Sequence, residues 1–157
     1  HPERVRSLII CNSRADVTEE FRDIFDRRIA LALAEGMEPL VASTVEHWFT
    51  AELRAAAPIS LDDVRAMVRT TPPVGYAGCA RAVQSLDYMA RLPAIDKPVL
   101  FIAGAEDIAT PADGMRAMQA VLSGSQYVEL SPASHLSNLE QPEAFTAAAR
   151  KFLAARV

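Results

Sequence analysis

The chain has 157 residues, half of them hydrophobic and 23% charged, which fits one globular domain with a sizeable buried core. Its net charge of −4 argues against nucleic acid or an anionic membrane surface as the main partner. The apolar runs fall far short of the ~20 residues that a membrane helix needs, and we find no secretory signal pattern.

Cysteine and histidine usage points away from disulfides and metals. Cys11 and Cys79 form no C-x-x-C pair, so we expect two reduced, buried thiols in a cytoplasmic protein. The three histidines, at positions 1, 47 and 135, are scattered and lack the spacing of a zinc site. We therefore expect no metal site.

The first half of the chain changes early from strand to helix. Residues 5–11 are rich in apolar and β-branched side chains, which predicts a strand. Apolar residues then recur about every 3.6 positions from Phe21 to Leu33, which predicts a helix between N-cap candidates at 16–18 and a stop at Gly36. Further helices are predicted over 38–47, 61–70 and 76–89, without a strand between them. Residues 13–92 are thus expected to form one helical insertion.

From residue 93 onward the pattern alternates between strand and helix. Strands are predicted over 99–103 and 127–130, with a helix starting at Thr110–Pro111 between them and a last helix over 142–155. Strands separated by helices predict a parallel sheet covered on both faces. The fold class is therefore α/β, with residues 1–12 and 93–157 as its core.

Two ionisable residues follow the predicted strands directly. Asp107 ends the turn after the first of them, and His135 lies in the loop after the second. Ligands of open α/β sheets bind at this edge, and an acid that orients a proton-transferring histidine is part of a nucleophilic triad. Glu106 and Asp113 are competing acids, and a turn aspartate that caps its own backbone or a plain surface histidine would look similar. We prefer Asp107.

These two loops resemble the acid and histidine loops of the α/β-hydrolase superfamily. The resemblance lies in residues 104–111 (G-A-E-D-I-A-T-P) and 134–143 (S-H-L-S-N-L-E-Q-P-E), and residues 1–9 resemble the segment that leads into the family's sixth strand. Residues 75–82 (G-Y-A-G-C-A-R-A) together with the second loop look most like 3-oxoadipate enol-lactonases. Esterases, epoxide hydrolases, haloperoxidase-like enzymes and C–C hydrolases share these loops, and the fold does not choose among their reactions.

The resemblance implies that Asp107 and His135 are the second and third members of the family's triad, in the order nucleophile, acid, histidine. No G-x-S-x-G nucleophile elbow occurs in the 157 residues. We therefore expect the nucleophile and the oxyanion-hole loop to lie outside this chain, which would correspond to the C-terminal part of the fold and be inactive alone.

Residues 13–92 would then be the family's helical cap, which shapes the substrate pocket. Trp48 is the preferred substrate-binding residue because a large amphipathic ring suits a pocket wall. Phe49 and Met37 are further wall candidates, although packing between helices would explain all three equally well. Arg81 could bind a substrate carboxylate, but an exposed helix charge explains it more simply.

The resemblance implies a cofactor-independent serine-type hydrolase that cleaves a small ester or enol-lactone when completed by the N-terminal part of the same fold. One alternative is a haloalkane- or epoxide-hydrolase relative with an aspartate nucleophile. Another is a non-catalytic fragment that binds a ligand or a partner. Nucleic acid and membranes are not expected as partners.

Overall fold

The structure, a computed structural model, describes residues 1–155 and divides the chain into two compact units. The first unit contains residues 1–14, residues 48–50 and the described residues from Met89 onward, and the second contains residues 15–47 and 51–88. The expected insertion over 13–92 was continuous, whereas Trp48–Thr50 group with the first unit. Each unit is described by itself.

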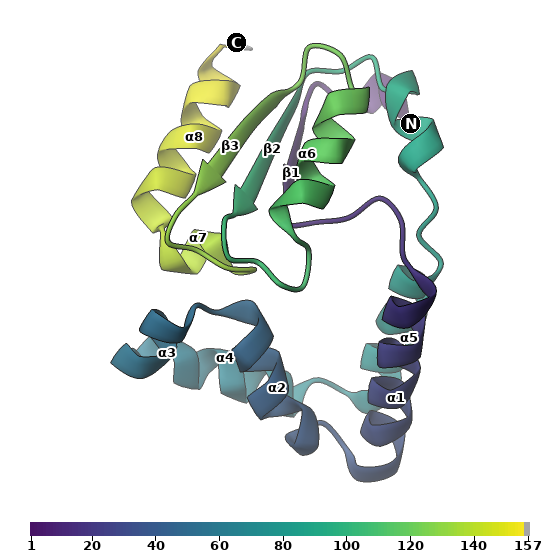
Figure 1. The fold of residues 1–157 in the computed structure, drawn as a ribbon, viewed down its shortest axis with the longest axis vertical. Helices are drawn as coiled ribbons and strands as arrows, with labels where there is room; N and C mark the ends of the chain where they lie inside the picture. The colour runs from purple at the N-terminus through teal and green to yellow at the C-terminus, as the bar shows by residue number, and fades with distance from the viewer. Residues whose placement is uncertain (156–157) are drawn as a thin grey trace. The chain divides into compact units, whose positions relative to one another are not determined.

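The first unit is built on a three-stranded parallel sheet (Figure 1). Its strands, in spatial order, are β1 (Leu8–Cys11), β2 (Val99–Gly104) and β3 (Gln126–Leu130). Leu8 is in register with Val99, and Leu100 with Gln126. The predicted parallel α/β sheet is confirmed, although β1 starts later than expected, at Leu8, where its pairing with Val99 of β2 begins.

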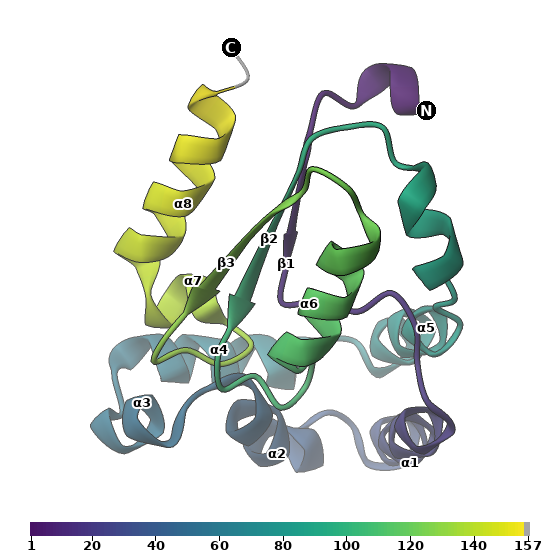
Figure 2. The same ribbon diagram turned by 45° about the horizontal axis from the view of Figure 1, so that its top comes forward.

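The central strand β2 is buried at all six positions, as its unbroken apolar sequence requires of a strand covered on both faces. Leu100 and Ile102 pack with Leu130 and with Phe152 of helix α8 (Pro142–Ala154). Side chains alternate between the faces, so Phe101 belongs to the opposite face. Helix α6 (Ala112–Val121) connects β2 to β3 and contacts both strands. It lies in front of the sheet in Figures 1 and 2.

Short elements complete the first unit. The 3₁₀ helix η2 (Met89–Ala94) precedes β2, and the single turn α7 (Ser137–Glu140) follows the histidine loop. Helix α5, which was predicted to reach residue 89, ends earlier, at Gln84. The turn α7 was not predicted, because four residues are too few for a periodic apolar pattern.

The second unit is entirely helical apart from one isolated bridge between Asp16 and Asp87. Its helices are α1 (Glu19–Glu35), α2 (Glu38–Trp48, whose last residue belongs to the first unit), α3 (Ala51–Ala56), α4 (Ile59–Thr70) and α5 (Pro73–Gln84). The expected start and stop of α1 are confirmed: Thr18 Oγ1 accepts a hydrogen bond from the Phe21 N–H, and Gly36 ends the helix with a φ of 81°. The six-residue α3 was not predicted.

Helices α1 and α5 share one apolar cluster of the helical unit. Ile29 of α1 packs with Ala77 and Ala80 of α5, and Phe25 and Tyr76 border this cluster. The small alanines allow the two helices to approach closely. Burial of the larger apolar side chains stabilises such a pair by roughly 1.5–3 kcal/mol each.

One expectation about the cysteines is wrong. Cys79 lies on an exposed face of α5, whereas Cys11 in β1 is half-buried. Both are free thiols, and burial raises the pKa of Cys11. The error arose because cysteine is usually buried, while residue 79 falls on the solvent side of the helix.

Gly104 marks the place where the end of β2 meets the histidine loop. A β-carbon at this position would lie 2.1 Å from the Ser134 carbonyl oxygen and 2.7 Å from that of Ala133. Both atoms belong to backbone, so a side chain could be accommodated only by moving the loop. Glycine at residue 104 is therefore a condition for the position of His135.

We predict that Gly104→Ala lowers the free energy of unfolding by roughly 2–3 kcal/mol, because the added methyl overpacks against backbone. Urea denaturation measures this change. Gly114→Ala in α6 is the matched control, because no neighbouring atom lies within 4 Å of its added β-carbon. The control should be neutral or stabilise by up to about 1 kcal/mol, since alanine is the better helix former. Equal effects of the two substitutions would refute the steric argument.

Candidate active site

Three polar side chains meet at the carboxyl edge of the sheet, one after each strand. Asn12 follows β1, Asp107 follows β2 and His135 follows β3. The carboxyl ends of parallel strands lie at one edge, where ligands of α/β sheets bind. Two of these residues were expected here from the sequence. Asn12 was missed, and its only sequence signal is its place directly after a strand.

The Asp107 carboxylate is enclosed by hydrogen-bond donors. Its Oδ1 accepts from the backbone N–H groups of Ala109 and Thr110, both at 2.8 Å. Its Oδ2 accepts from Thr110 Oγ1 at 2.6 Å and from Asn12 Nδ2 at 2.9 Å. The same Oδ2 lies 2.9 Å from His135 Nδ1, and no part of the Asp107 side chain is exposed. The acid is thus held in one orientation.

The donors also set the charge of this group. Burial raises the pKa of Asp107, but the hydrogen bonds from His135, Thr110 and Asn12 together outweigh burial and hold the pKa below its ordinary value. Asp107 is therefore ionised at neutral pH and can only accept hydrogen bonds.

This charge fixes the proton on the histidine ring. The single hydroxyl hydrogen of Thr110 points to Asp107, so Thr110 Oγ1, 3.3 Å from His135 Nδ1, can only accept from the ring. Nδ1 faces two acceptors and must carry a hydrogen. In the neutral ring the lone pair is then on Nε2, so His135 can accept a proton on the side away from Asp107.

The competing acids lie elsewhere. Glu106 is exposed, and Asp113 is exposed in the first turn of α6. The carboxylate against His135 is that of Asp107, which agrees with the order of preference drawn from the sequence.

Trp48 is the third residue expected at the site, and it lies beside the histidine. Its ring centroid is 6.1 Å from that of His135, and its carbonyl oxygen accepts a hydrogen bond of 3.1 Å from the Leu136 N–H. Trp48 as a residue is half-buried. Phe49 and Met37, in contrast, are 2% and 5% exposed and serve packing. Arg81 is exposed on α5.

A carboxylate that sequence reasoning missed joins the Trp48 segment to the histidine loop. Glu140 Oε1 accepts from the Thr50 N–H at 2.9 Å and from Thr50 Oγ1 at 2.7 Å. Its Oε2 accepts from the Ser134 N–H. Glu140 thereby connects Thr50, two residues after Trp48, to Ser134, the residue directly before His135. Its partners lie 90 and 6 positions away, which no local pattern reveals.

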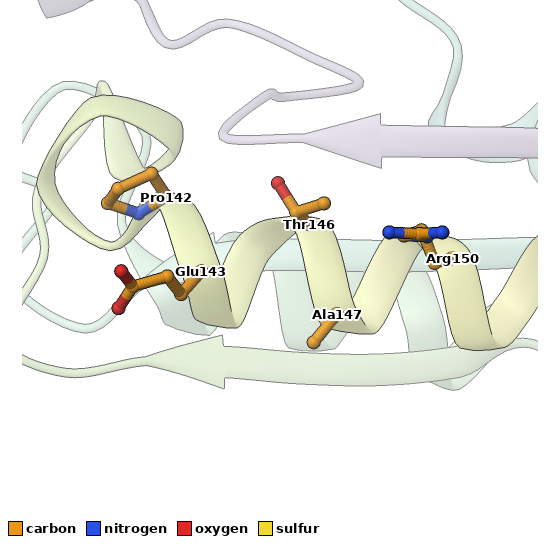
Figure 3. A pocket seen from close by; sticks show the side chains of 5 residues that line it. All are labelled: Pro142, Glu143, Thr146, Ala147 and Arg150. Carbon is orange, nitrogen blue, oxygen red and sulfur yellow. The ribbon is translucent and has the colours of Figure 1, made fainter.

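A shallow hollow on α8 does not include these residues. It is lined by Pro142, Glu143, Thr146, Ala147 and Arg150, all from one helix (Figure 3). Within residues 1–155, no three His, Cys, Asp or Glu side chains gather as a metal site would require. Nor does this part of the chain contain a helix long and apolar enough to cross a membrane.

We predict that acid removes a stabilising contribution of Asp107. The folded chain keeps this carboxylate ionised to a lower pH than the unfolded chain does, so the contribution is complete above the ordinary pKa of 3.8 and is lost as the pH falls through the lower folded-state value. Asp107→Asn should therefore cost about 3 kcal/mol at pH 7 but clearly less at pH 3. Denaturant titrations of each variant and of the unchanged protein at both pH values measure this loss in the free energy of unfolding. Asp113→Asn, at an exposed site, should change that free energy little at either pH. A loss for Asp107→Asn that stays constant or grows in acid would contradict the prediction.

Comparisons with known proteins agree with this geometry. Residues 1–142 match the model of the alpha/beta hydrolase fold family. The chain is 32% identical over 145 residues to a 3-oxoadipate enol-lactonase of Acinetobacter baylyi, covering 92% of the chain and 53% of that protein. An enol-lactonase structure from Burkholderia xenovorans matches with a TM-score of 0.93 at 32% identity, over 98% of this chain and 58% of that one.

A structure of a hydrolase from Pseudomonas aeruginosa matches with a TM-score of 0.91 at 37% identity, over 97% of this chain and 57% of that one. The chain thus spans about half the length of the curated relatives that it matches. The parallel sheet, the order of the polar residues along the chain and the match to the family model all agree. The chain belongs to the α/β-hydrolase fold family.

Proposed function

We propose that this chain carries the acid and the histidine of a cofactor-independent hydrolase that cleaves a small ester or an enol-lactone. The observation that carries the proposal is the buried, ionised Asp107 with its Oδ2 2.9 Å from His135 Nδ1. Such a pair leaves Nε2 free to move protons. Enol-lactonases among the relatives support the substrate class.

In the proposed reaction, a serine hydroxyl attacks the substrate carbonyl while His135 Nε2 takes the hydroxyl proton. The histidine returns this proton to the leaving oxygen, which breaks the ester bond and leaves an acyl-enzyme. It then takes a proton from water, whose oxygen attacks the acyl carbon. The bond between the acyl group and the serine oxygen breaks, the histidine gives its proton to that oxygen, and the acid is released. Asp107 stabilises the imidazolium in both halves, and backbone amides stabilise the oxyanion.

The serine and the oxyanion-hole amides are proposed to come from residues outside these 157, which contain no G-x-S-x-G sequence. The coverage of about half of the relatives' length supports this. The proposed partner is thus the N-terminal part of the same fold. Within the described residues, β1 pairs only with β2. Ile9 and Cys11 alternate along β1 with the residues whose backbone groups bond to β2. The backbone groups of Ile9 and Cys11 therefore point away from β2 and are available to another strand.

Two further roles belong to this proposal. Trp48 would form a wall of the substrate site, because its ring lies beside His135. The helical unit would be the cap of the enzyme.

We predict that the complete protein hydrolyses 3-oxoadipate enol-lactone or a small aryl ester. His135→Ala and Asp107→Asn should each lower kcat by ~10³–10⁴-fold, since one removes the base and the other leaves the ring in the wrong tautomer. His47→Ala is the matched control at an exposed histidine and should keep full activity. The 157-residue chain alone should show no turnover.

Each outcome of these experiments tests a different part of the proposed function. Turnover by the chain alone, abolished by His135→Ala, would overturn the proposed external nucleophile. Full activity of His135→Ala in the complete protein would overturn the triad. No turnover of any ester by the complete protein would favour a binding protein, and an aspartate at the nucleophile position would favour haloalkane- or epoxide-hydrolase chemistry.

We predict that Trp48→Ala raises KM by roughly 10-fold with a smaller change in kcat, because a pocket wall acts mainly in substrate binding. Initial rates with a bulky and a small ester measure this, and the bulky ester should be affected more. Tyr88→Ala, at an exposed aromatic of the helical unit, is the control. A fall in kcat with unchanged KM for both esters would contradict the proposal that Trp48 forms a wall of the substrate site. It would indicate instead that Trp48 orients His135.

A further inference from the structure

Asn12 is a buried side chain that the proposed reaction does not use. Its Nδ2 donates to Asp107 Oδ2 at 2.9 Å and to the Ser134 carbonyl oxygen at 3.1 Å. Its Oδ1 accepts from Ser137 Oγ at 2.5 Å. One amide therefore touches the acid, the residue before the histidine and the turn after it.

The orientation of this amide is determined by its partners. Asp107 Oδ2 and the Ser134 carbonyl can only accept, so both hydrogens of Nδ2 are required on their side. The hydroxyl of Ser137 supplies the matching donor on the other side. A rotated amide would bring its oxygen against two acceptors, which burial would make costly.

The backbone at this position also selects for asparagine. Asn12 has a φ of 41°, in the left-handed region that asparagine tolerates better than most residues. Its own N–H still donates to the Ile102 carbonyl oxygen at 2.9 Å, so the turn is tied to β2. The side chain is thus directed from the end of β1 toward the two loops at a fixed point.

The contribution of Asn12 differs from that of the other donors to Asp107. Ala109 and Thr110 belong to the acid's own loop and move with it. Asn12 comes from a different strand and holds the acid and the histidine loop at the same time. A shift of one loop relative to the other would break one of its two donated bonds.

We propose that Asn12 is a positioning residue that fixes Asp107 against His135 by bridging the acid loop and the histidine loop. The proposal rests on the proposed function of the Asp107–His135 pair. Asn12 itself touches no reacting atom and acts only through the geometry of that pair.

The test is Asn12→Gly in the complete protein, because glycine keeps the positive φ and removes only the amide. We expect kcat for a small aryl ester to fall 10- to 100-fold with KM changed less than 3-fold, the size of effect seen when supporting residues around a catalytic centre are removed. We also expect loss or a marked shift of the downfield proton signal of the His135 Nδ1–H, assigned by its absence in His135→Ala.

Two further variants separate positioning from stability. Ser137→Ala leaves Asn12 in place but removes the donor that orients its amide, so it should lower kcat by a smaller factor and broaden the same signal. Asn138→Gly is the matched control: residue 138 is exposed on α7, and glycine weakens that turn without touching the pair. The control should lower the melting temperature and leave kcat and the signal unchanged.

Unchanged kcat and an unchanged Nδ1–H signal in folded Asn12→Gly would overturn the proposal, as would a loss of kcat equal to that of Asn138→Gly at equal loss of stability. If Asn12→Gly does not fold, Ser137→Ala decides by the same two readouts. The proton signal requires no substrate. It can therefore report the position of Asp107 against His135 even if the proposed hydrolase activity fails, which keeps the two failures distinguishable.

Discussion

The structure of the first unit depends on one buried negative charge, the carboxylate of Asp107. A carboxylate removed from water is tolerated only when hydrogen-bond donors replace its hydration. Here the donors come from the acid's own loop, from the end of β1 and from the loop after β3. One charge is therefore stabilised by donors that come from the ends of three strands.

The parallel sheet makes this arrangement possible. Because β1, β2 and β3 run in the same direction, their carboxyl ends and the loops that follow lie at one edge. Gly104 then lets the backbone of the histidine loop pass directly against β2, and the N–H groups of Ala105 and Glu106 bond to the Leu130 and Ala133 carbonyls. The loops are thus fixed by backbone contacts before any side chain is considered. Side chains refine a geometry that the sheet already provides.

The sequence was informative where local pattern and chemistry coincide. The sequence predicted that Asp107 and His135 lie together, because each follows an apolar strand and carries an ionisable side chain, and the structure places them 2.9 Å apart. Asn12 and Glu140 were missed because their importance comes only from partners distant in sequence, such as Asp107 for one and Thr50 for the other. The helices α3 and α7 were missed for another reason, since they are too short to show a helical period. The exposure of Cys79 likewise depends on which helix face meets the core.

Glu140 is a second carboxylate at the same edge of the sheet, and its role there is to accept hydrogen bonds. By accepting from Thr50 and from the Ser134 N–H, it holds the segment after Trp48 at the base of the histidine loop. The Leu136 N–H also donates to the Trp48 carbonyl oxygen, so the backbone of this segment is held at Trp48 and again at Thr50. The histidine loop is therefore held from two directions, by Asn12 through Ser134 and Ser137 and by Glu140 through Ser134 and Thr50. In the proposed reaction, a ring held in this way would transfer protons at one position, because neither its backbone nor its acid partner would have to be ordered anew in each cycle.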